Sequence, residues 1–180
     1  MRVFQLVLIA SLFGLAGCVN PHIKPKLSEL ELTHGGIAYF STASLEKCIA
    51  HSIYLSLKNE KDDKAVNFPK YQFFVTNQFV EKDFPETRGF FQIVSLPAGT
   101  YKLLFDQGHP IPNVEYEQLL TPFTIEQGEV KYLGEIEVDG CFRIAVKIGD
   151  KYERDTEKLK ALYPDVGKRK ISKGLLKISK

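Results

Sequence analysis

Residues 130–148 read VKYLGEIEVDGCFRIAVKI, two alternating segments joined by Asp139 and Gly140. The second segment carries its large apolar side chains at every other position, namely Phe142, Ile144, Val146 and Ile148. A period of two is typical of a strand with one buried face, and Asp-Gly between two such runs is a strong hairpin signal. The stretch predicts a hairpin with these side chains in the core and with Arg143 and Lys147 exposed.

Shorter runs of the same kind precede this stretch. They cover residues 53–57, 71–75, 90–96, 101–105 and 121–125. Between two of them, Pro97-Ala98-Gly99-Thr100 has the residues of a tight turn, and we expect a second hairpin there. Seven or eight short strands with closely spaced turn signals predict an all-β fold, an antiparallel β-sandwich of the prealbumin-like or immunoglobulin-like kind.

One helix is expected late in the chain. Residues 153–162 carry acids early and Lys158 and Lys160 late, and Pro164 stands just beyond, which are the signals of a short helix and its end. The chain has 180 residues, of which 26% are charged, so one folded domain is expected. We place the sandwich domain at residues 35–150 and the short helix with a basic C-terminal tail at residues 151–180.

The N-terminal residues have the pattern of a secretion signal. Arg2 is the only charged residue before Lys24, and the apolar run from Val3 to Ala16 follows it. Its 14 residues are too few to cross a hydrocarbon core of about 30 Å, which takes about 20 residues. We interpret residues 1–17 as a signal peptide.

Leu15-Ala16-Gly17-Cys18 closes this run and resembles the lipobox of bacterial lipoproteins. The resemblance implies cleavage before Cys18, acyl chains such as palmitate on that residue, and stable attachment to a membrane. In that family an Asp directly after the cysteine retains the protein at the inner membrane. Val19 and Asn20 stand there instead, which implies the outer membrane. We expect the domain to face the periplasm, with exposure at the cell surface as the alternative. The alternative is that Cys18 is an ordinary thiol.

Residues 18–34 show no sustained periodicity and are interpreted as a tether. Further on, residues 88–138 resemble small bacterial envelope lipoproteins with a prealbumin-like or carboxypeptidase-regulatory-like sandwich. The matching pieces are Leu96-Pro97-Ala98-Gly99-Thr100-Tyr101 and Tyr132-Leu133-Gly134. The resemblance implies a sandwich that binds or scaffolds rather than catalyses.

Cys48 and Cys141 remain as a pair once Cys18 is assigned to lipid. Thiols in an oxidising compartment tend to form disulfides. Each of the two lies out of step with the apolar face beside it, so both are expected near strand ends, off the main core. A disulfide between them is our prediction; two unpaired buried thiols, or a reactive or metal-binding thiol, are the alternatives.

Motifs for catalysis and metal binding are incomplete. Ser44 and Lys47 match a Ser-x-x-Lys pattern, but its two companion motifs are absent. Cys48 and His51, three residues apart, would point to opposite faces of a strand. The other histidines have no ligand spacing. We therefore expect no catalytic residues, no metal and no cofactor, and a net charge of +2 gives no reason to expect nucleic acid as a partner.

Two segments are candidate binding surfaces. The stretch from Asp106 to Leu119 is long for a hairpin connection and contains His109 and Tyr116. It either packs on one end of the sandwich or presents a ligand or partner loop.

The second candidate is the basic tail, which has no acid from Gly167 onward. Its basic residues are Lys168, Arg169, Lys170, Lys173, Lys177 and Lys180. Ile171, Leu175 and Ile178 have helical spacing, which would allow an amphipathic helix on anionic lipid or cell wall. A frayed tail, or a final edge strand with exposed lysines, is the alternative.

Taken together, these features predict an outer-membrane lipoprotein. The membrane is its partner through the lipid on Cys18, and its sandwich serves as a non-catalytic binding or scaffolding module of the cell envelope with a possible protein partner. An accessory subunit of an envelope secretion or assembly complex is the alternative function. An envelope hydrolase is a more distant one.

Overall fold

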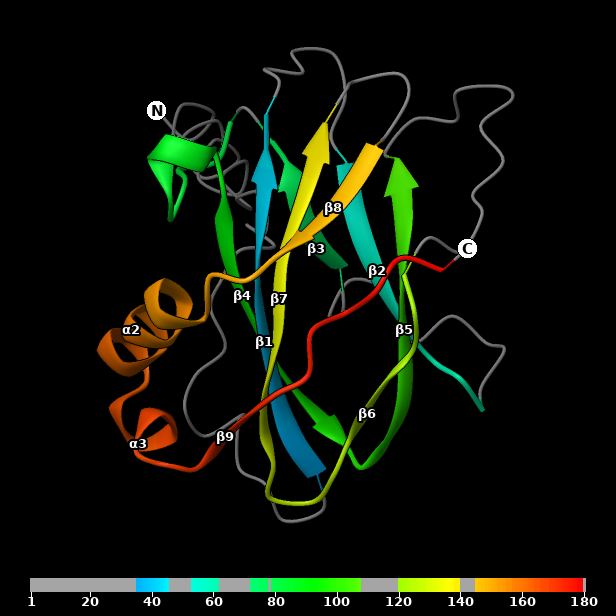
Figure 1. The fold of residues 1–180 in the computed structure, drawn as a ribbon, viewed down its shortest axis with the longest axis vertical. Coiled ribbons are helices and arrows are strands. Elements are labelled where there is room, and N and C mark those ends of the chain that lie inside the picture. Colours follow the sequence, from blue (N-terminus) through cyan, green and yellow to red (C-terminus); the bar gives the residue numbers. More distant parts are fainter. Residues whose placement is uncertain are drawn as a thin grey trace, which may run out of the picture.

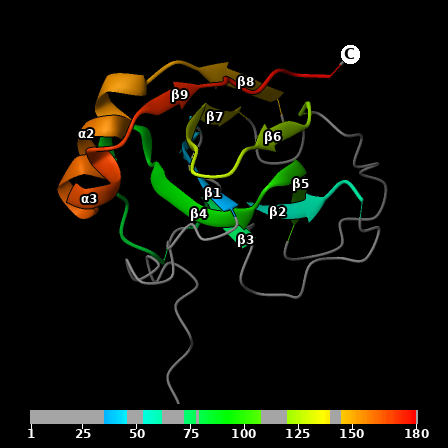
Figure 2. The same ribbon diagram turned by 90° about the horizontal axis from the view of Figure 1, so that it is seen from below.

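The computed structural model describes residues 35–45, 53–61, 72–77, 79–107, 120–139 and 145–179. They form an all-β sandwich of two sheets with a short helix near the C-terminus (Figures 1 and 2). The first sheet contains β4 (Phe90–Pro97), β1 (Gly35–Ser44), β7 (Val130–Asp139), β8 (Ala145–Gly149) and β9 (Ile171–Lys173). The second contains β3 (Gln72–Thr76), β2 (Ile53–Asn59), β5 (Gly99–Gln107) and β6 (Phe123–Ile125). The helical segments are η2 (Pro85–Thr87), α2 (Tyr152–Leu162) and α3 (Pro164–Gly167).

The prediction of a β-sandwich is confirmed, but one of its sheets is mixed rather than antiparallel. β1 runs parallel to β7, and β7 runs parallel to β9, while every other neighbouring pair is antiparallel. One edge of β7 is divided between two partners. β8 pairs with its second half, and β9 pairs with its first half after the chain has passed through α2 and α3.

The main core lies between the sheets and follows the period of two seen in the sequence. Ile53, Leu55 and Leu57 of β2 are buried, and the residues between them are half-buried. A second apolar cluster lies on the outer face of the first sheet, where Leu159 and Val166 from the helices pack against β1 and β7 (Figure 2). Both faces of β1 are therefore covered, and all ten of its residues are buried.

The predicted hairpin at Pro97–Thr100 is wrong, because the turn leads from one sheet to the other. β4 pairs with β1, whereas β5 pairs with β2 and β6. β4 has apolar side chains on both faces, as suits a sheet covered on both sides, while β5 buries alternate residues. The Tyr101 hydroxyl donates to the Pro97 carbonyl at 2.7 Å, closing the corner like the tyrosine corner of other sandwiches.

The hairpin of β7 and β8 is confirmed, but its predicted two-residue turn is wrong. Asp139 belongs to β7 and pairs with Ala145, and Val138 pairs with Val146. A turn of two residues would pair Ile136 with Arg143 and place that arginine in the core, so the apolar pattern selects a longer connection. Val146 and Ile148 pack partly buried against the core, while Lys147 is exposed. The predicted positions of residues 142–144 lie outside the described residues.

The predicted helix is confirmed as α2, and the basic tail is not helical. Pro164 ends α2 and also begins α3, where its missing N–H costs no hydrogen bond. Ile171 pairs instead with Val130 in a parallel strand, and Leu176 is 3% exposed in the core. An extended tail forms hydrogen bonds with the backbone at the open edge of β7 and buries Leu176. The interpretation as an amphipathic helix on a surface is therefore wrong.

Candidate functional site

We call residues 168–179 the C-terminal strap; it crosses from the first sheet to the second (Figure 1). The Gly174 and Leu176 amides donate to carbonyls of β7, at 2.9 and 3.0 Å. The Lys177 carbonyl then accepts from the Thr121 amide at 2.7 Å, just before β6. Ile178 forms an isolated bridge with Leu120. The strap therefore joins the edges of both sheets and closes one side of the sandwich.

Glu129 holds the beginning of the strap against β7. Its Oε1 accepts from the Ser172 hydroxyl at 2.5 Å and pairs with the Lys131 ammonium at 3.0 Å, and its Oε2 accepts from the Glu126 amide at 2.9 Å. Burial alone would raise the pKa of Glu129, but the bonds from Ser172, Glu126 and Lys131 outweigh it and lower the pKa. The folded strap thus favours the ionised carboxylate.

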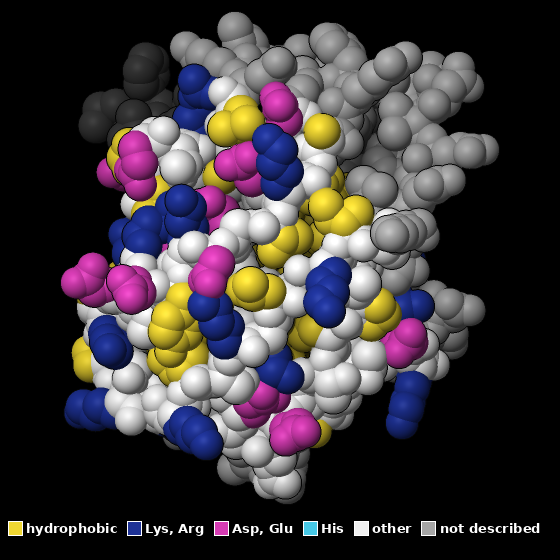
Figure 3. All heavy atoms as spheres, in the orientation of Figure 1, with side chains coloured by type: hydrophobic (Ala, Val, Ile, Leu, Met, Phe, Trp, Pro, Cys, Tyr) yellow, Lys and Arg dark blue, Asp and Glu magenta, His cyan; other side chains and the backbone are white. Residues whose placement is uncertain are grey.

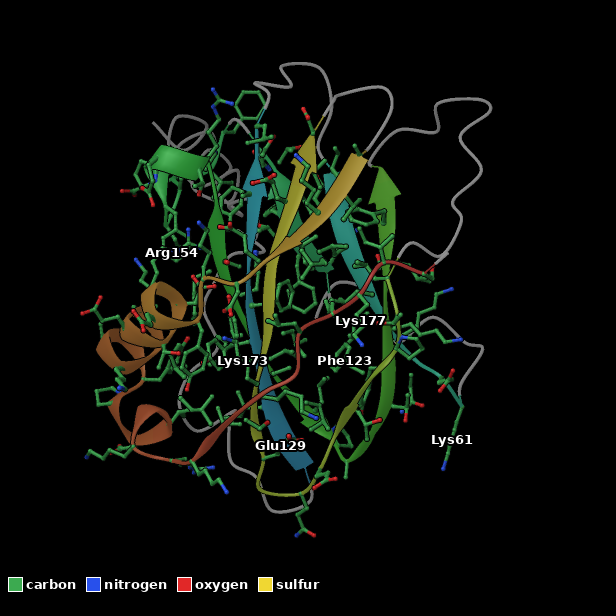
Figure 4. The ribbon with its side chains drawn as sticks, in the orientation of Figure 1. Lys61, Phe123, Glu129, Arg154, Lys173 and Lys177 are labelled. Atoms are coloured by element: carbon green, nitrogen blue, oxygen red, sulfur yellow. The ribbon has the colours of Figure 1, made fainter. Side chains whose placement is uncertain are left out.

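A second ion pair joins the middle of the strap to Asp150, two residues before α2. Lys173 pairs with Asp150, and its ammonium lies 5.2 Å from the centre of the Tyr152 ring. The Lys173 hydrogen bond lowers the pKa of Asp150. Figure 4 shows Glu129, Lys173 and Lys177 spaced along this side of the sandwich.

The outer surface of the strap combines cations and apolar groups. Lys173, Leu175 and Lys177 alternate outward, because Leu176 between them is buried. Arg169 and Lys170 are exposed where α3 leads into β9. In Figure 3, Lys and Arg side chains lie among apolar side chains on this face. Five of the six predicted contact residues thus share one ordered segment, while Lys180 lies outside the described residues.

A buried polar cluster, which the sequence analysis missed, lies between α2 and the first sheet. Asp155 Oδ2 accepts from the Ser41 hydroxyl at 2.6 Å and from the Tyr132 hydroxyl at 3.1 Å. The Arg154 guanidinium donates to Asp155, to Ser41 and, at 2.7 Å, to Glu135. Beside them the hydroxyls of Tyr39 and Thr156 are hydrogen-bonded at 2.7 Å. Figure 4 shows Arg154 reaching from α2 toward the strands.

A β-bulge brings Glu135 into this cluster. Tyr39 pairs with Tyr132, but Ser41 pairs with Glu135, so β7 has one extra residue in this interval. Gly134 lies in the bulge with φ of +105°, a conformation that residues with a Cβ rarely adopt. The bulge turns Glu135 to the outer face, next to Ser41. Without it Glu135 would point into the core between the sheets.

Burial and the neighbouring charges shift the pKa values of Asp155 and Arg154 in this cluster. Burial raises the pKa of Asp155, although bonds from Ser41, Arg154 and Tyr132 oppose the shift. Burial alone would lower the pKa of Arg154, but Glu135 and Asp155 outweigh it and raise the pKa. These polar atoms are directed at one another, and the Arg154 guanidinium also stacks 3.9 Å from the Phe84 ring. The cluster therefore docks α2 onto the sheet.

Several predicted site residues lie outside the described residues. They are Cys18, Cys48, Cys141, His109 and Tyr116. Ser44 and Asp139, at the ends of the neighbouring strands β1 and β7, precede the two predicted disulfide cysteines by four and two residues.

Within the described part of the chain, two other kinds of site have no structural support. No group of three or more His, Cys, Asp or Glu side chains there is arranged to hold a metal ion. No helix there is long and apolar enough to span a membrane. No protein-family model, curated protein or solved structure matches the chain.

Proposed function

We propose that the protein is an outer-membrane lipoprotein with its domain facing the periplasm, and that the sandwich is a non-catalytic binding or scaffolding module of the cell envelope. The observation that carries the proposal is the box Leu15-Ala16-Gly17-Cys18 behind Arg2 and a short apolar run. Processing at this box leaves Cys18 as the lipid-bearing first residue, and two or three acyl chains hold a protein stably at a bilayer.

The position of the first strand supports this arrangement. β1 begins at Gly35, so residues 19–34 separate the lipid site from the sandwich. Sixteen residues reach at most about 55 Å when fully extended. The domain can therefore stand clear of the headgroups or contact them while Cys18 remains in the membrane.

The contacts of the described polar side chains favour binding rather than catalysis. Asp155 and Glu135 are the buried charged residues of the described part of the chain, and both pair with Arg154. Asp155 and Arg154 also bond to the Ser41 hydroxyl. Catalytic acids need to reach a substrate atom, whereas these side chains dock a helix. The strap, in contrast, directs its charges outward.

Metabolic labelling with a fatty-acid probe tests the lipid anchor. The wild-type protein is expected to incorporate the probe and to fractionate with outer membranes, and Cys18→Ser is expected to do neither. Cys48→Ser is the matched control, because it also replaces a cysteine but leaves the box intact. Equal labelling of the wild type and Cys18→Ser would contradict the proposal.

A further inference from the structure

The strap and its surroundings carry unmatched positive charge. Among the residues that the structure describes, three acids pair with lysines of this region. The pairs are Asp165–Lys168, Asp150–Lys173 and Glu129–Lys131. Arg169, Lys170 and Lys177 are exposed and have no ion pair among the residues that the structure describes. Six basic and three acidic side chains give this surface a net charge of +3.

Two exposed apolar side chains stand on the same segment as these charges. Leu175 is 37% exposed and Ile178 is 45% exposed, on either side of Lys177. Large apolar side chains gain free energy when water is removed from them. The backbone on which they stand is held by the hydrogen bonds to β7 and Thr121, so the surface exists before any partner binds.

We propose that this surface binds the headgroups of anionic phospholipids. Arg169, Lys170 and Lys177 would lie against lipid phosphates, and Leu175 and Ile178 would enter the boundary between headgroups and acyl chains. Each Lys or Arg near an anionic bilayer raises affinity about fivefold, within a Debye length of the surface. A purely polyanionic cell-wall polymer would match the cations but offers the apolar pair no hydrocarbon.

The inference rests on the proposed lipid anchor for its place in the cell, but the binding itself does not require the anchor. With Cys18 in the bilayer, the sixteen residues 19–34 that lie between it and β1 let the strap reach the same membrane. Contact through the strap would then set the orientation of the sandwich. Failure of vesicle binding would leave the lipid anchor untouched, and failure of lipid labelling would leave the vesicle result untouched.

The test uses a protein that begins at Val19, because both sheets and both apolar clusters are formed within residues 35–179. Binding to phosphatidylglycerol vesicles and to phosphatidylcholine vesicles is measured by co-sedimentation, in about 0.01 M and about 0.15 M salt. The protein is expected to bind the anionic vesicles at low salt, to weaken as salt rises, and not to bind the neutral vesicles.

Two triple variants with the same change of net charge separate the strap from the rest of the surface. Replacing Arg169, Lys170 and Lys177 by Gln is expected to weaken binding about 100-fold. The control replaces Lys58, Lys61 and Lys102 by Gln, on and next to β2 and β5 of the second sheet, where Figure 4 shows Lys61 projecting outward. In about 0.15 M salt the control is expected to weaken binding less than about threefold, because the Debye length is then about 8 Å and charges outside the contact surface contribute little.

A third variant tests the apolar component. Leu175→Ser with Ile178→Ser is expected to weaken binding about tenfold, because two partly exposed apolar side chains no longer enter the bilayer boundary. Thermal unfolding of each variant checks that it is folded. The inference is overturned by equal binding to neutral vesicles, by no binding at low salt, by equal effects of the two triple variants, or by tighter binding to isolated peptidoglycan than to anionic vesicles.

Discussion

Arg154 of α2 and Glu135 of β7 form an ion pair of 2.7 Å, in which the Glu135 side chain is only 2% exposed. The same guanidinium also pairs with the fully buried Asp155 at 2.8 Å. One cation therefore forms ion pairs with two buried carboxylates. Because α2 buries only Asp155, Thr156 and Leu159, its attachment to the sheet depends on polar contacts as much as on apolar packing.

Arg154→Met is expected to destabilise the protein by about 3 kcal/mol. The substitution keeps much of the apolar stem but leaves Glu135 and Asp155 without their cation. Removing one partner of a buried ion pair lowers the free energy of unfolding by more than the pair itself adds, because the remaining charge stays buried and unpaired. Urea unfolding followed by circular dichroism measures the effect. Lys158→Met is the control, because its pair with Asp83 is 3.4 Å long and more exposed, and a loss below about 1 kcal/mol is expected there. Similar losses for both variants would contradict the account of the cluster.

Leu176→Ala is expected to destabilise the protein by about 3 kcal/mol, because it opens a cavity where a core side chain was. Leu175→Ala, one residue earlier, removes the same atoms from a side chain that is 37% exposed. That change is expected to cost less than about 1 kcal/mol. Equilibrium unfolding of the two variants compares them directly. Equal effects would mean that the strap does not pack as an extended segment with Leu176 inward.

Glu129 is expected to make stability depend on pH in the acid range. Its pKa in the folded protein lies below the ordinary value of 4.5, so the unfolded chain takes up the proton first as pH falls. The stabilisation by this carboxylate is then fully present above pH 4.5 and is lost as pH falls through the native pKa.

The difference in unfolding free energy between the wild type and Glu129→Gln measures this contribution. It is expected to be constant at neutral pH and to shrink as pH falls through that window. Ser172→Ala removes one hydrogen bond to Glu129 and is expected to make the pH-dependent part smaller. A difference that grows on acidification would show the opposite sign and contradict the assignment.

A disulfide between Cys48 and Cys141 remains our prediction. The Leu45 amide donates to the Val138 carbonyl at 3.1 Å, so the ends of β1 and β7 are adjacent. Cys48 comes three residues after Leu45, and Cys141 three residues after Val138. A disulfide requires Cα atoms within about 7 Å. Alkylation of unreduced protein is expected to spare both thiols and to modify both after reduction; full modification without reductant would rule the bond out.

Strand periodicity allowed much of the fold to be predicted from the sequence. The alternation at Ile53, Leu55 and Leu57 and the helix end at Pro164 both depend on local patterns, which need no knowledge of distant segments. The choice of sheet for β4 and β5 does not depend on local patterns, because Pro97 and Gly99 suit a hairpin and a crossing between sheets equally well.

The candidate site was less accessible to sequence reasoning. Ser41 and Asp155 are 114 residues apart, and only the fold brings them together. The single local signal was Gly134, whose positive φ marks the bulge that turns Glu135 outward. The positive charge of the tail was evident from its composition. Its extended conformation was not, because Ile171, Leu175 and Ile178 have helical spacing only by coincidence. Hydrogen bonds to β7 hold this segment extended.

We propose that Cys18 anchors the sandwich through lipid, and the mass of the N-terminal peptide is the decisive measurement. Protein purified from cell membranes is digested, and the peptide that contains Cys18 is identified by mass spectrometry. The expected peptide begins at Cys18 and carries diacylglyceryl and amide-linked acyl groups. A peptide that continues from Cys18 back into the preceding residues, with an unmodified thiol, would contradict it.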